Sequence, residues 1–283
     1  MAHSLESSDE IARRKIRLAK DNGEKSLVLS GLGIASLNTI IRDLFDFEKI
    51  ESIDLSDNRL RTLPHEMSAL LNLKSLNLSG NLITSLPYSL TKITNLRSVD
   101  LSNQRFSEDV LDVLSEFSSL EVLNFSNCGI SIPSSNFGKI SSLHNLNLSK
   151  NKISMVPSWV GRLVELRTLN LSNNNLTGVP LPGSIVNCLN LNWLDVANNN
   201  LTSVQSAIFE IYGLRHLDVS GNSIRTLESN FSKLLLLKTL CAQSNKIGHI
   251  EDGFRKCLSL EYLDLSSNKL HSLGRWIDDL KNT

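Results

Sequence analysis

The chain has 283 residues, and its 29 basic and 29 acidic side chains give a formal charge of zero. Hydrophobic residues make up 41% of it but aromatic residues only 5%, so the core must be aliphatic. The balanced charge argues against a protein built chiefly to hold nucleic acid, and the four cysteines are too sparse for a disulfide scaffold. No apolar run is long enough to span a membrane, which leaves a soluble protein of a reducing compartment.

The first predicted element is a helix within residues 1–23, which we expect to cover the first strand of the fold. Ser7, followed three residues later by Glu10, resembles a capping box, and Asn22-Gly23 is a suitable stop. The helix carries a partial apolar stripe of Ile11, Ala12, Ile16, Leu18 and Ala19. Its basic run at residues 13–17 fits a localisation signal, a membrane-surface patch or a solvated helix face, and the flanking acidic residues favour the last.

From residue 24 to residue 273 the sequence repeats itself. The segment LKSLNLSGNLI at 73–83 returns as LRTLNLSNNNL at 166–176 and as LEYLDLSSNKL at 260–270. If the first apolar residue of each unit is position 1, units follow one another at intervals of 23 to 25 residues. With an irregular first unit there are eleven, and the later ten begin at Ile50, Leu73, Leu96, Leu120, Leu143, Leu166, Leu191, Leu214, Leu237 and Leu260.

This LxxLxLxxNxL pattern resembles that of the leucine-rich-repeat family. The match is specific because the pattern recurs in register along the chain. The resemblance implies an α/β solenoid, a leucine-rich-repeat horseshoe of about eleven repeats with a parallel β-sheet on its concave face and an N-terminal capping helix. The LxL alternation is typical of a half-buried strand with its leucines inward. The repeats are most similar to the intracellular 23-residue type of plant Ras-group proteins, Scribble and Roco proteins. A short C-terminal cap is expected at 274–283, where Trp276, Ile277 and Leu280 can fold down.

Position 9 of the unit predicts a structural asparagine ladder, because a buried amide there can bond the backbone of neighbouring turns. Cys128 takes this position once, while Gln104 and Leu32 depart from the pattern, so we expect the ladder to be interrupted at those two units. The asparagines are Asn58, Asn81, Asn151, Asn174, Asn199, Asn222, Asn245 and Asn268.

Two further features concern the convex side. Proline follows the outer leucine at Pro64, Pro87, Pro157 and Pro180, which suits an extended or turn-like backbone. The segment Ser107–Phe117 instead predicts a helix, with Val110, Leu111, Leu114 and Phe117 on one face.

Position 3 of each unit faces outward on the concave sheet and changes character along the chain. Its first seven residues are small or polar, but Trp193, His216 and Tyr262 are ring-bearing. Aromatic side chains are frequent interface anchors, although isolated exposed rings also occur on ordinary surfaces. With their neighbours at position 5, the predicted partner-binding residues are Trp193, Asp195, His216, Asp218, Cys241, Tyr262 and Asp264.

The charge on the same face is predicted to be mildly acidic, which favours a basic or polar segment of a partner protein over a phosphate backbone. Only Lys150 is basic among these columns. The alternative is that the acidic residues merely alternate with asparagine, as consensus positions do, and select no partner. The acidic residues are Asp54, Asp57, Asp100, Asp195, Asp218 and Asp264.

No catalytic or metal-binding motif is found, so we expect a protein that is not an enzyme and needs no cofactor. The six histidines are scattered without metal-ligand spacing, and no phosphate-binding loop or nucleophile elbow is present. His216, Asp218 and Cys241 lie on neighbouring predicted strands, but their diagonal separation of about 7–8 Å is too long for a cysteine–histidine pair.

These observations predict a non-enzymatic protein-interaction module, a signalling scaffold or adaptor, monomeric and bound to neither nucleic acid nor membrane. Four Asn-x-Ser sequences on the concave face, at Asn77, Asn124, Asn147 and Asn170, point to a cytoplasmic location or to a cell that does not glycosylate, because glycans there would block the face. Two alternatives stay open. One is a bacterial effector, secreted into a host cytosol, or a regulatory subunit that occupies an enzyme. The other is self-association through the thin C-terminal cap.

Overall fold

The computed structural model describes residues 6–45, 47–107, 110–131 and 135–271. The chain divides into two compact units, residues 1–129 and residues 130–283. The C-terminal cap expected at 274–283 lies outside the described residues.

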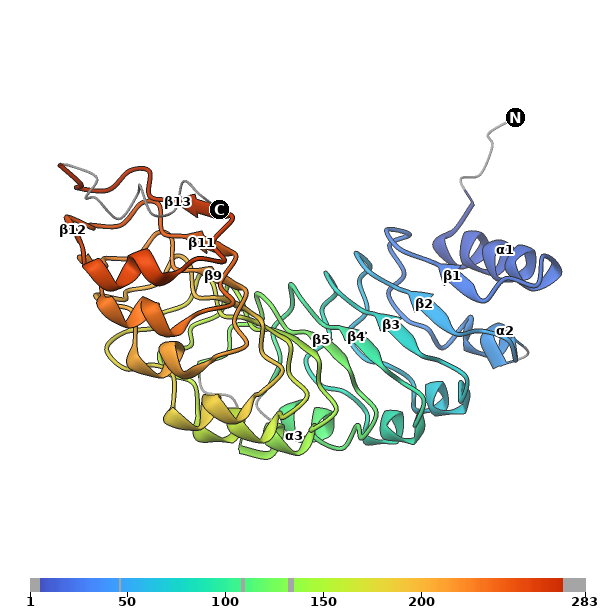
Figure 1. Cartoon of the computed structure of the whole chain (residues 1–283). Coiled ribbons are helices and arrows are strands. Elements are labelled where there is room, and N and C mark those ends of the chain that lie inside the picture. The colour runs from blue at the N-terminus through green and yellow to red at the C-terminus, as the bar shows by residue number, and fades with distance from the viewer. Residues whose placement is uncertain (1–5, 46, 108–109, 132–134, 272–283) are drawn as a thin grey trace. The chain divides into compact units, whose positions relative to one another are not determined.

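In the first unit, five parallel strands form one sheet in chain order, and short helices line the side opposite the sheet (Figure 1). The strands are β1 (Ser26–Val28), β2 (Ser52–Asp54), β3 (Ser75–Asn77), β4 (Ser98–Asp100) and β5 (Val122–Asn124). The helices are α1 (Ser8–Asp21), α2 (Ile41–Phe45), η1 (His65–Ala69), η2 (Tyr88–Lys92) and α3 (Val110–Leu114), where η marks a 3₁₀ helix.

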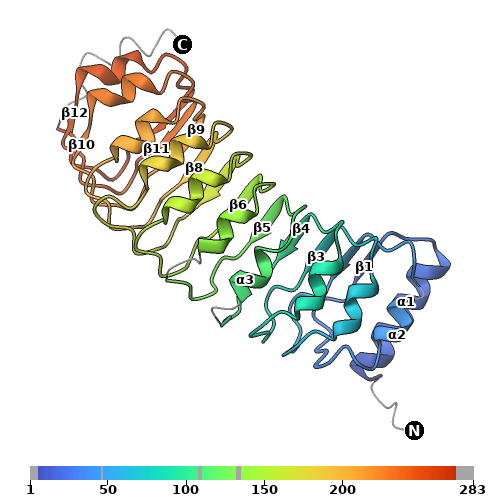
Figure 2. The same cartoon turned by 90° about the horizontal axis from the view of Figure 1, so that it is seen from below.

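The second unit has the same plan, with six parallel strands in chain order and a small two-stranded sheet on its helical side. Its main strands are β6 (Asn145–Asn147), β7 (Thr168–Asn170), β8 (Trp193–Asp195), β9 (His216–Asp218), β11 (Thr239–Cys241) and β13 (Tyr262–Asp264), and β10 (Thr226–Leu227) pairs with β12 (His249–Ile250). Its 3₁₀ helices are η3 (Ser135–Lys139), η4 (Ser158–Arg162), η5 (Gly183–Asn187), η6 (Ser206–Glu210), η7 (Ser229–Lys233) and η8 (Asp252–Lys256), and they lie side by side (Figure 2).

Each main strand is three residues long, and its middle residue points into the core while the first and third point to solvent. In β3, for example, Leu76 is buried, whereas Ser75 and Asn77 are half-buried. Adjacent strands pair without any shift, so that Ser75 lies opposite Ser98 and Leu76 opposite Val99. We call the outer surface made by the first and third strand residues the sheet face.

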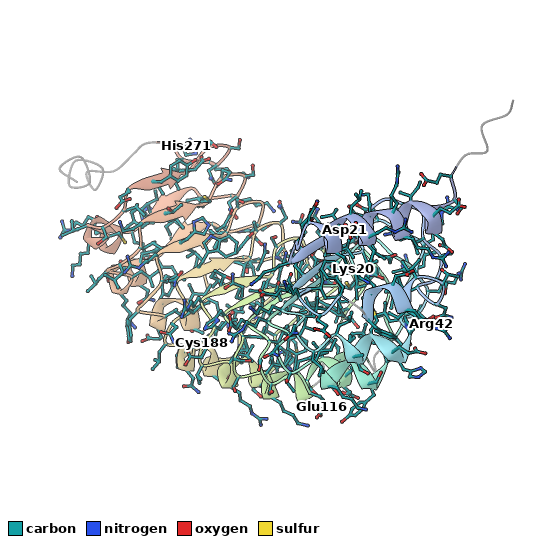
Figure 3. The ribbon with its side chains drawn as sticks, turned by 90° about the vertical axis from the view of Figure 1, so that its right-hand side faces the viewer. Lys20, Asp21, Arg42, Glu116, Cys188 and His271 are labelled. Atoms are coloured by element: carbon teal, nitrogen blue, oxygen red, sulfur yellow. The ribbon has the colours of Figure 1, made fainter. Side chains whose placement is uncertain are left out.

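The predicted N-terminal helix is present as α1, and it covers the edge strand of the first unit. Its capping box is complete, because the Ser7 side chain accepts from the Glu10 N–H and the Glu10 carboxylate accepts from the Ser7 N–H. Ala12, Ile16 and Ala19 are buried, but Leu18 is exposed, so its assignment to the apolar stripe was wrong. The helix ends with Lys20 and Asp21 (Figure 3).

The basic run of α1 is largely engaged with the rest of the first unit. The Arg13 guanidinium donates to the Thr39 carbonyl at 2.8 Å and pairs with Asp43 at 3.4 Å. The Lys15 amine donates to the Val28 carbonyl at 3.1 Å. These bonds fasten the helix to the first repeat.

Buried amides join the turns of consecutive repeats within each of the two compact units. In Asn81, the side-chain N–H groups donate to the Leu55 and Leu78 carbonyls at 2.9 Å, and Oδ1 accepts from the Leu60 N–H at 3.0 Å. The prediction that the ladder is interrupted at Gln104 was wrong. Its longer side chain reaches the same groups, donating to the Leu78 carbonyl at 2.8 Å and accepting from the Ile83 N–H at 3.1 Å.

Two other residues end or replace this pattern in the first unit. The Cys128 thiol donates to the Leu101 carbonyl at 3.3 Å, so it supplies one of the asparagine's bonds. Leu32 has no amide, and its backbone carbonyl instead accepts from the Ser8 hydroxyl of α1 at 2.6 Å. The capping helix thus takes over where the ladder stops.

In the turn after each strand, the residue at position 8 of the repeat has a left-handed backbone conformation. The sequence pattern did not predict this feature. The eleven residues are Gly31, Asp57, Gly80, Asn103, Asn127, Lys150, Asn173, Asn198, Gly221, Ser244 and Ser267, all with a positive φ. Glycine and asparagine tolerate this conformation well, which explains their frequency at the position.

The helical side differs in detail from the prediction. The helix predicted at Ser107–Phe117 is present as the shorter α3, and Val110, Leu111, Leu114 and Phe117 are all buried. Apart from α2, the other described repeats have short 3₁₀ helices on this side. Pro64, Pro87 and Pro157 are the N-cap residues of three of them, because proline's fixed φ suits a helix start.

Candidate functional site

The predicted site residues lie on four neighbouring strands of the second unit, in register. Along the first row of the sheet face, Trp193 lies opposite His216, His216 opposite Thr239, and Thr239 opposite Tyr262. The parallel row at the third strand residue runs from Asp195 through Asp218 and Cys241 to Asp264. The structure therefore brings all seven predicted residues onto one surface.

Two of the three rings form a pair. The indole of Trp193 and the imidazole of His216 stack with ring centroids 5.0 Å apart and planes only 5° from parallel. Both side chains are half-buried, so each presents part of its ring to solvent. Tyr262 does not join them, because Thr239 lies between it and His216; its side chain is 53% exposed.

The aspartates of the second row have a structural duty that limits what they offer a ligand. Oδ1 of Asp195 accepts from the Ala197 N–H at 2.8 Å, and Oδ1 of Asp218 accepts from the Ser220 N–H at 2.8 Å. Asp264 makes the same bond to the Ser266 N–H at 2.9 Å. Each carboxylate thus holds the turn after its strand with one oxygen, which explains why position 5 is so often Asp or Asn.

The protonation of this row reflects its crowding. Burial raises the pKa of the Asp195 carboxyl, the Ala197 N–H opposes that shift, and the neighbouring Asp218 adds to it. The pKa of the His216 imidazole is lowered by burial, against the opposing pull of Asp218. At neutral pH the stacked Trp193–His216 pair is therefore mainly uncharged.

Cys241 is the least reactive kind of thiol in this setting. Burial, together with the nearby charges of Asp218, Asp264 and Asp195, raises its pKa to about 11. A nucleophilic cysteine needs the opposite, a lowered pKa and a base in contact. Cys241, His216 and Asp218 therefore lack the electrostatics of a catalytic triad.

Gln243 adds an acceptor to the site that sequence reasoning missed. It stands at position 7 of its repeat, where nine of the eleven repeats have serine, and it lies two residues beyond Cys241. Its Oε1 atom is buried and has no hydrogen-bond partner in the described part of the chain. Buried acceptors are normally satisfied, so this oxygen is an exception among the polar groups of the described residues. Its departure from serine was the available signal.

A column of charged residues lies beside the sheet face, immediately before several of the strands, and the repeat pattern did not predict it. Arg167 precedes β7, Arg215 precedes β9 and Lys238 precedes β11, and both arginine side chains are exposed. Lys238 forms an ion pair with Glu261. The first row of the sheet face therefore has a border of mixed charge, in which Arg167, Arg215 and Lys238 are basic and Glu261, before β13, is acidic.

Metal binding and membrane insertion find no support among the described residues. Within them, no group of three or more His, Cys, Asp or Glu side chains could hold a metal ion. Among the helices that the structure describes, none has the length and apolar character needed to cross a membrane.

Family models of leucine-rich repeats match this sequence along most of its length. One leucine-rich-repeat model matches residues 48–106 and 190–247. A second matches residues 119–140, 142–163, 165–188 and 259–282. The chain therefore belongs to the leucine-rich-repeat family, and its fold is a solenoid of such repeats, as predicted. The intracellular 23-residue type remains a prediction. A search among curated protein sequences gave no match.

Solved structures with this fold include a leucine-rich-repeat protein of Leptospira interrogans, at 25% identity and a TM-score of 0.81, covering 93% of this chain and 72% of that one. The ectodomain of the Arabidopsis receptor kinase HAESA, in complex with a peptide hormone ligand, is 29% identical at a TM-score of 0.68, with 86% of this chain and 42% of that chain covered. TLR13 in a complex with ssRNA13 is 24% identical at a TM-score of 0.74, covering 93% and 38%. The chain thus spans less than half of either receptor.

Proposed function

We propose that this chain is a binding module without catalytic activity that holds a partner protein on the sheet face of its second unit. Leucine-rich repeats are a fold that commonly mediates protein–protein interaction, and solved relatives of the fold carry peptide and RNA ligands. The observation that carries the proposal is the stacked, half-exposed Trp193–His216 pair, which stands on a face whose other residues, Tyr262 apart, are small or polar.

The ring pair has the properties of an interface anchor. Tryptophan is enriched among the residues whose truncation weakens binding most, because it offers a large contact area with few rotatable bonds. Stacking on His216 holds the indole in place before a partner arrives, so little side-chain entropy is lost on binding. Tyr262 is a second, separate contact point, three strand spacings or roughly 14 Å from Trp193 along the sheet.

The charges on this face favour a basic segment of the partner protein over nucleic acid. Asp218 and Asp264 each keep one carboxylate oxygen beyond the turn bond, and Asp195 adds a further negative charge to the row. A lysine or arginine of the partner would supply the donors that this row lacks. A phosphate backbone would meet carboxylates instead, which disfavours it.

We further propose that the protein works as a monomeric scaffold or adaptor in the cytoplasm. The amide of Asn124, which begins an Asn-x-Ser sequence, donates to Oδ2 of Asp100 at 2.8 Å, and a glycan on that nitrogen would displace the bond. The thiols of Cys128, Cys188 and Cys257 are buried and donate to backbone carbonyls, a role that requires the reduced form.

A comparative affinity purification tests this proposal. Tagged wild-type protein is used to capture partners from its native cells, and the W193A/Y262A variant is used in parallel. Loss of the partners by the double variant supports the site. Tyr88→Ala serves as the matched control, because Tyr88 is an exposed ring on η2 of the first unit. Unchanged capture by W193A/Y262A, in a variant that keeps its circular dichroism spectrum, overturns the proposal.

A further inference from the structure

The second unit has an exposed apolar stripe on a surface other than the sheet face. In five consecutive repeats, the residue that follows the 3₁₀ helix by two positions is apolar and exposed, up to 81% for Leu189. We call this set the outer stripe; it consists of Val164, Leu189, Tyr212, Leu235 and Leu258. The repeat just before it has the polar Ser141 at the same position. Soluble proteins rarely expose contiguous apolar patches without a use for them.

Members of the stripe from adjacent repeats lie side by side. The Asn190 side chain, next to Leu189, donates to the Val164 carbonyl at 3.3 Å. The Ser259 hydroxyl, next to Leu258, donates to the Leu235 carbonyl at 2.6 Å. A Cβ atom built on Gly213, next to Tyr212, would lie 3.4 Å from the Leu189 carbonyl. These contacts bring the stripe residues of adjacent repeats together at three of the four junctions, from Val164 to Tyr212 and from Leu235 to Leu258.

A cavity of about 360 Å³ opens within the stripe. Leu189 and Tyr212 of the stripe line it, together with Val186, Ile211 and Cys188, the last of which is labelled in Figure 3. Its wall is mostly apolar, and Glu210 is its one charged residue among those described. A cavity of this size admits one large apolar side chain.

The net charge on both flanks of the stripe is basic, although Glu165, next to Val164, is an exposed acidic residue. The two nearby carboxylates with ion pairs are already neutralised, Glu210 by Lys233 and Glu261 by Lys238. The Glu210 carboxylate also accepts from the Tyr212 hydroxyl. Exposed arginines and lysines remain on the helix ends before the stripe and at the strand starts after it: Arg162, Arg255 and Lys256 on one flank, Arg167 and Arg215 on the other.

We propose that the outer stripe binds one amphipathic α-helix of a partner protein, whose apolar face is bordered by acidic side chains. Adjacent strands lie about 4.8 Å apart, and one turn of an α-helix rises about 5.4 Å. A helix laid across the repeats therefore offers one apolar side chain to each stripe residue, with a mismatch of only about 2 Å over five repeats. The basic flanks select acidic borders on the helix by charge complementarity.

This surface is independent of the proposed sheet-face site. The stripe residues stand in the turns before the strands, whereas Trp193 and Tyr262 stand on the strands themselves. Substitutions at one surface leave the side chains of the other in place, so the two proposals can fail separately.

A synthetic helical peptide of about 18 residues, five turns long, with leucines on one face and glutamates along both borders, tests the proposal. Fluorescence anisotropy of the labelled peptide should show binding to the whole chain that weakens as salt is raised. The double variant L189S/L235S should weaken it by about tenfold or more, because two exposed apolar contacts are lost. The variant W193A/Y262A should bind the peptide as the wild type does.

The matched control is Leu71→Ser in the first unit. Leu71 follows η1 by two positions and is 56% exposed, close to the 62% of Leu235, but its neighbour Thr94 is polar, so it has no stripe. The proposal is overturned by no binding of the glutamate peptide, by equal binding of the same peptide with lysine borders, or by equal losses in L71S and L189S/L235S. Binding to phosphatidylserine vesicles in place of the peptide would overturn it in favour of a membrane surface.

Discussion

At the scale of single residues, the buried amides do more than fill a consensus position. Asn174 illustrates this: Oδ1 accepts from the Ile153 N–H, and the amide nitrogen donates to the Leu148 and Leu171 carbonyls, all at 3.0 Å. Each bond ties the turn of one repeat to that of another, or to its own strand. The ladder thus converts a row of turns into one cooperative unit.

Replacing Asn174 by alanine should lower the free energy of unfolding by at least about 1–3 kcal/mol, because it leaves buried backbone groups without partners. Urea denaturation followed by circular dichroism measures this. Asn175→Ala is the control, since that neighbouring side chain is exposed and should cost little. Equal stabilities of the two variants would show that water replaces the ladder amides.

The Trp193–His216 pair makes a prediction about pH. The folded pKa of His216 is lowered from 6.5 by burial, so the unfolded chain takes up this proton first as the pH falls. The contribution of His216 to stability is therefore lost as the pH drops below 6.5 toward the folded pKa. An NMR titration of the imidazole should give a midpoint below 6.5, and D218N should lower it again because the opposing carboxylate charge is gone. A midpoint above 6.5 would mean that Asp218 outweighs burial.

At the scale of elements, strand register was predictable because leucines repeat at positions that must all face one core. Gln104 was misjudged because pattern matching treats a longer amide as a departure, whereas its extra methylene still reaches the Leu78 carbonyl. The left-handed turns were missed, since a column that mixes Gly, Asn, Ser, Asp and Lys has no obvious common property in sequence. The strand register predicts that the seven site residues lie together on one surface. The same register places Thr239 between His216 and Tyr262, so the separation of Tyr262 from the ring pair was also predictable, but we did not predict it.

The 3₁₀ helices pack closely where small residues allow it. A Cβ atom added at Gly161 in η4 would stand 2.4 Å from the Ser184 carbonyl oxygen, a backbone atom that cannot move alone. Gly161→Ala should therefore destabilise the protein by about 1–3 kcal/mol. Gly183→Ala, in η5, is the control, because nothing lies within 4 Å of its added Cβ. Thermal denaturation compares the two, and a stable G161A would contradict the close packing of η4 on η5.

At the scale of the whole molecule, a net charge of zero conceals surfaces of different sign. The second unit places carboxylates along its sheet face and arginines and lysines around the outer stripe. The core is mainly aliphatic but also buries phenylalanines, among them Phe209, Phe231 and Phe254, contrary to the purely aliphatic core predicted. Two of the three tryptophans lie within the described part of the second unit, Trp159 buried and Trp193 on the sheet face. Under our two proposals, one surface binds a basic segment and the other an acidic helix, so two partners could bind at once.

Removing the N-terminal helix should affect the first unit as a whole. Ala12, Ile16 and Ala19 of α1 are buried, and the helix lies against β1, so deletion of residues 1–23 exposes apolar surface at the end of the sheet. We expect a lower melting temperature and association of the truncated chain, measured by light scattering. A truncated protein that stays monomeric with an unchanged melting temperature would show that α1 is not a cap.

The central claim is that a partner protein occupies the sheet face of the second unit, and site-specific photocrosslinking tests it most directly. A benzophenone amino acid is placed at Thr239, between His216 and Tyr262, or at Tyr88 in the first unit as the control. We expect irradiation of the complex to join the partner to the protein labelled at Thr239 and not to the one labelled at Tyr88. Crosslinks from Tyr88 alone, or from neither position in an intact complex, would contradict the claim.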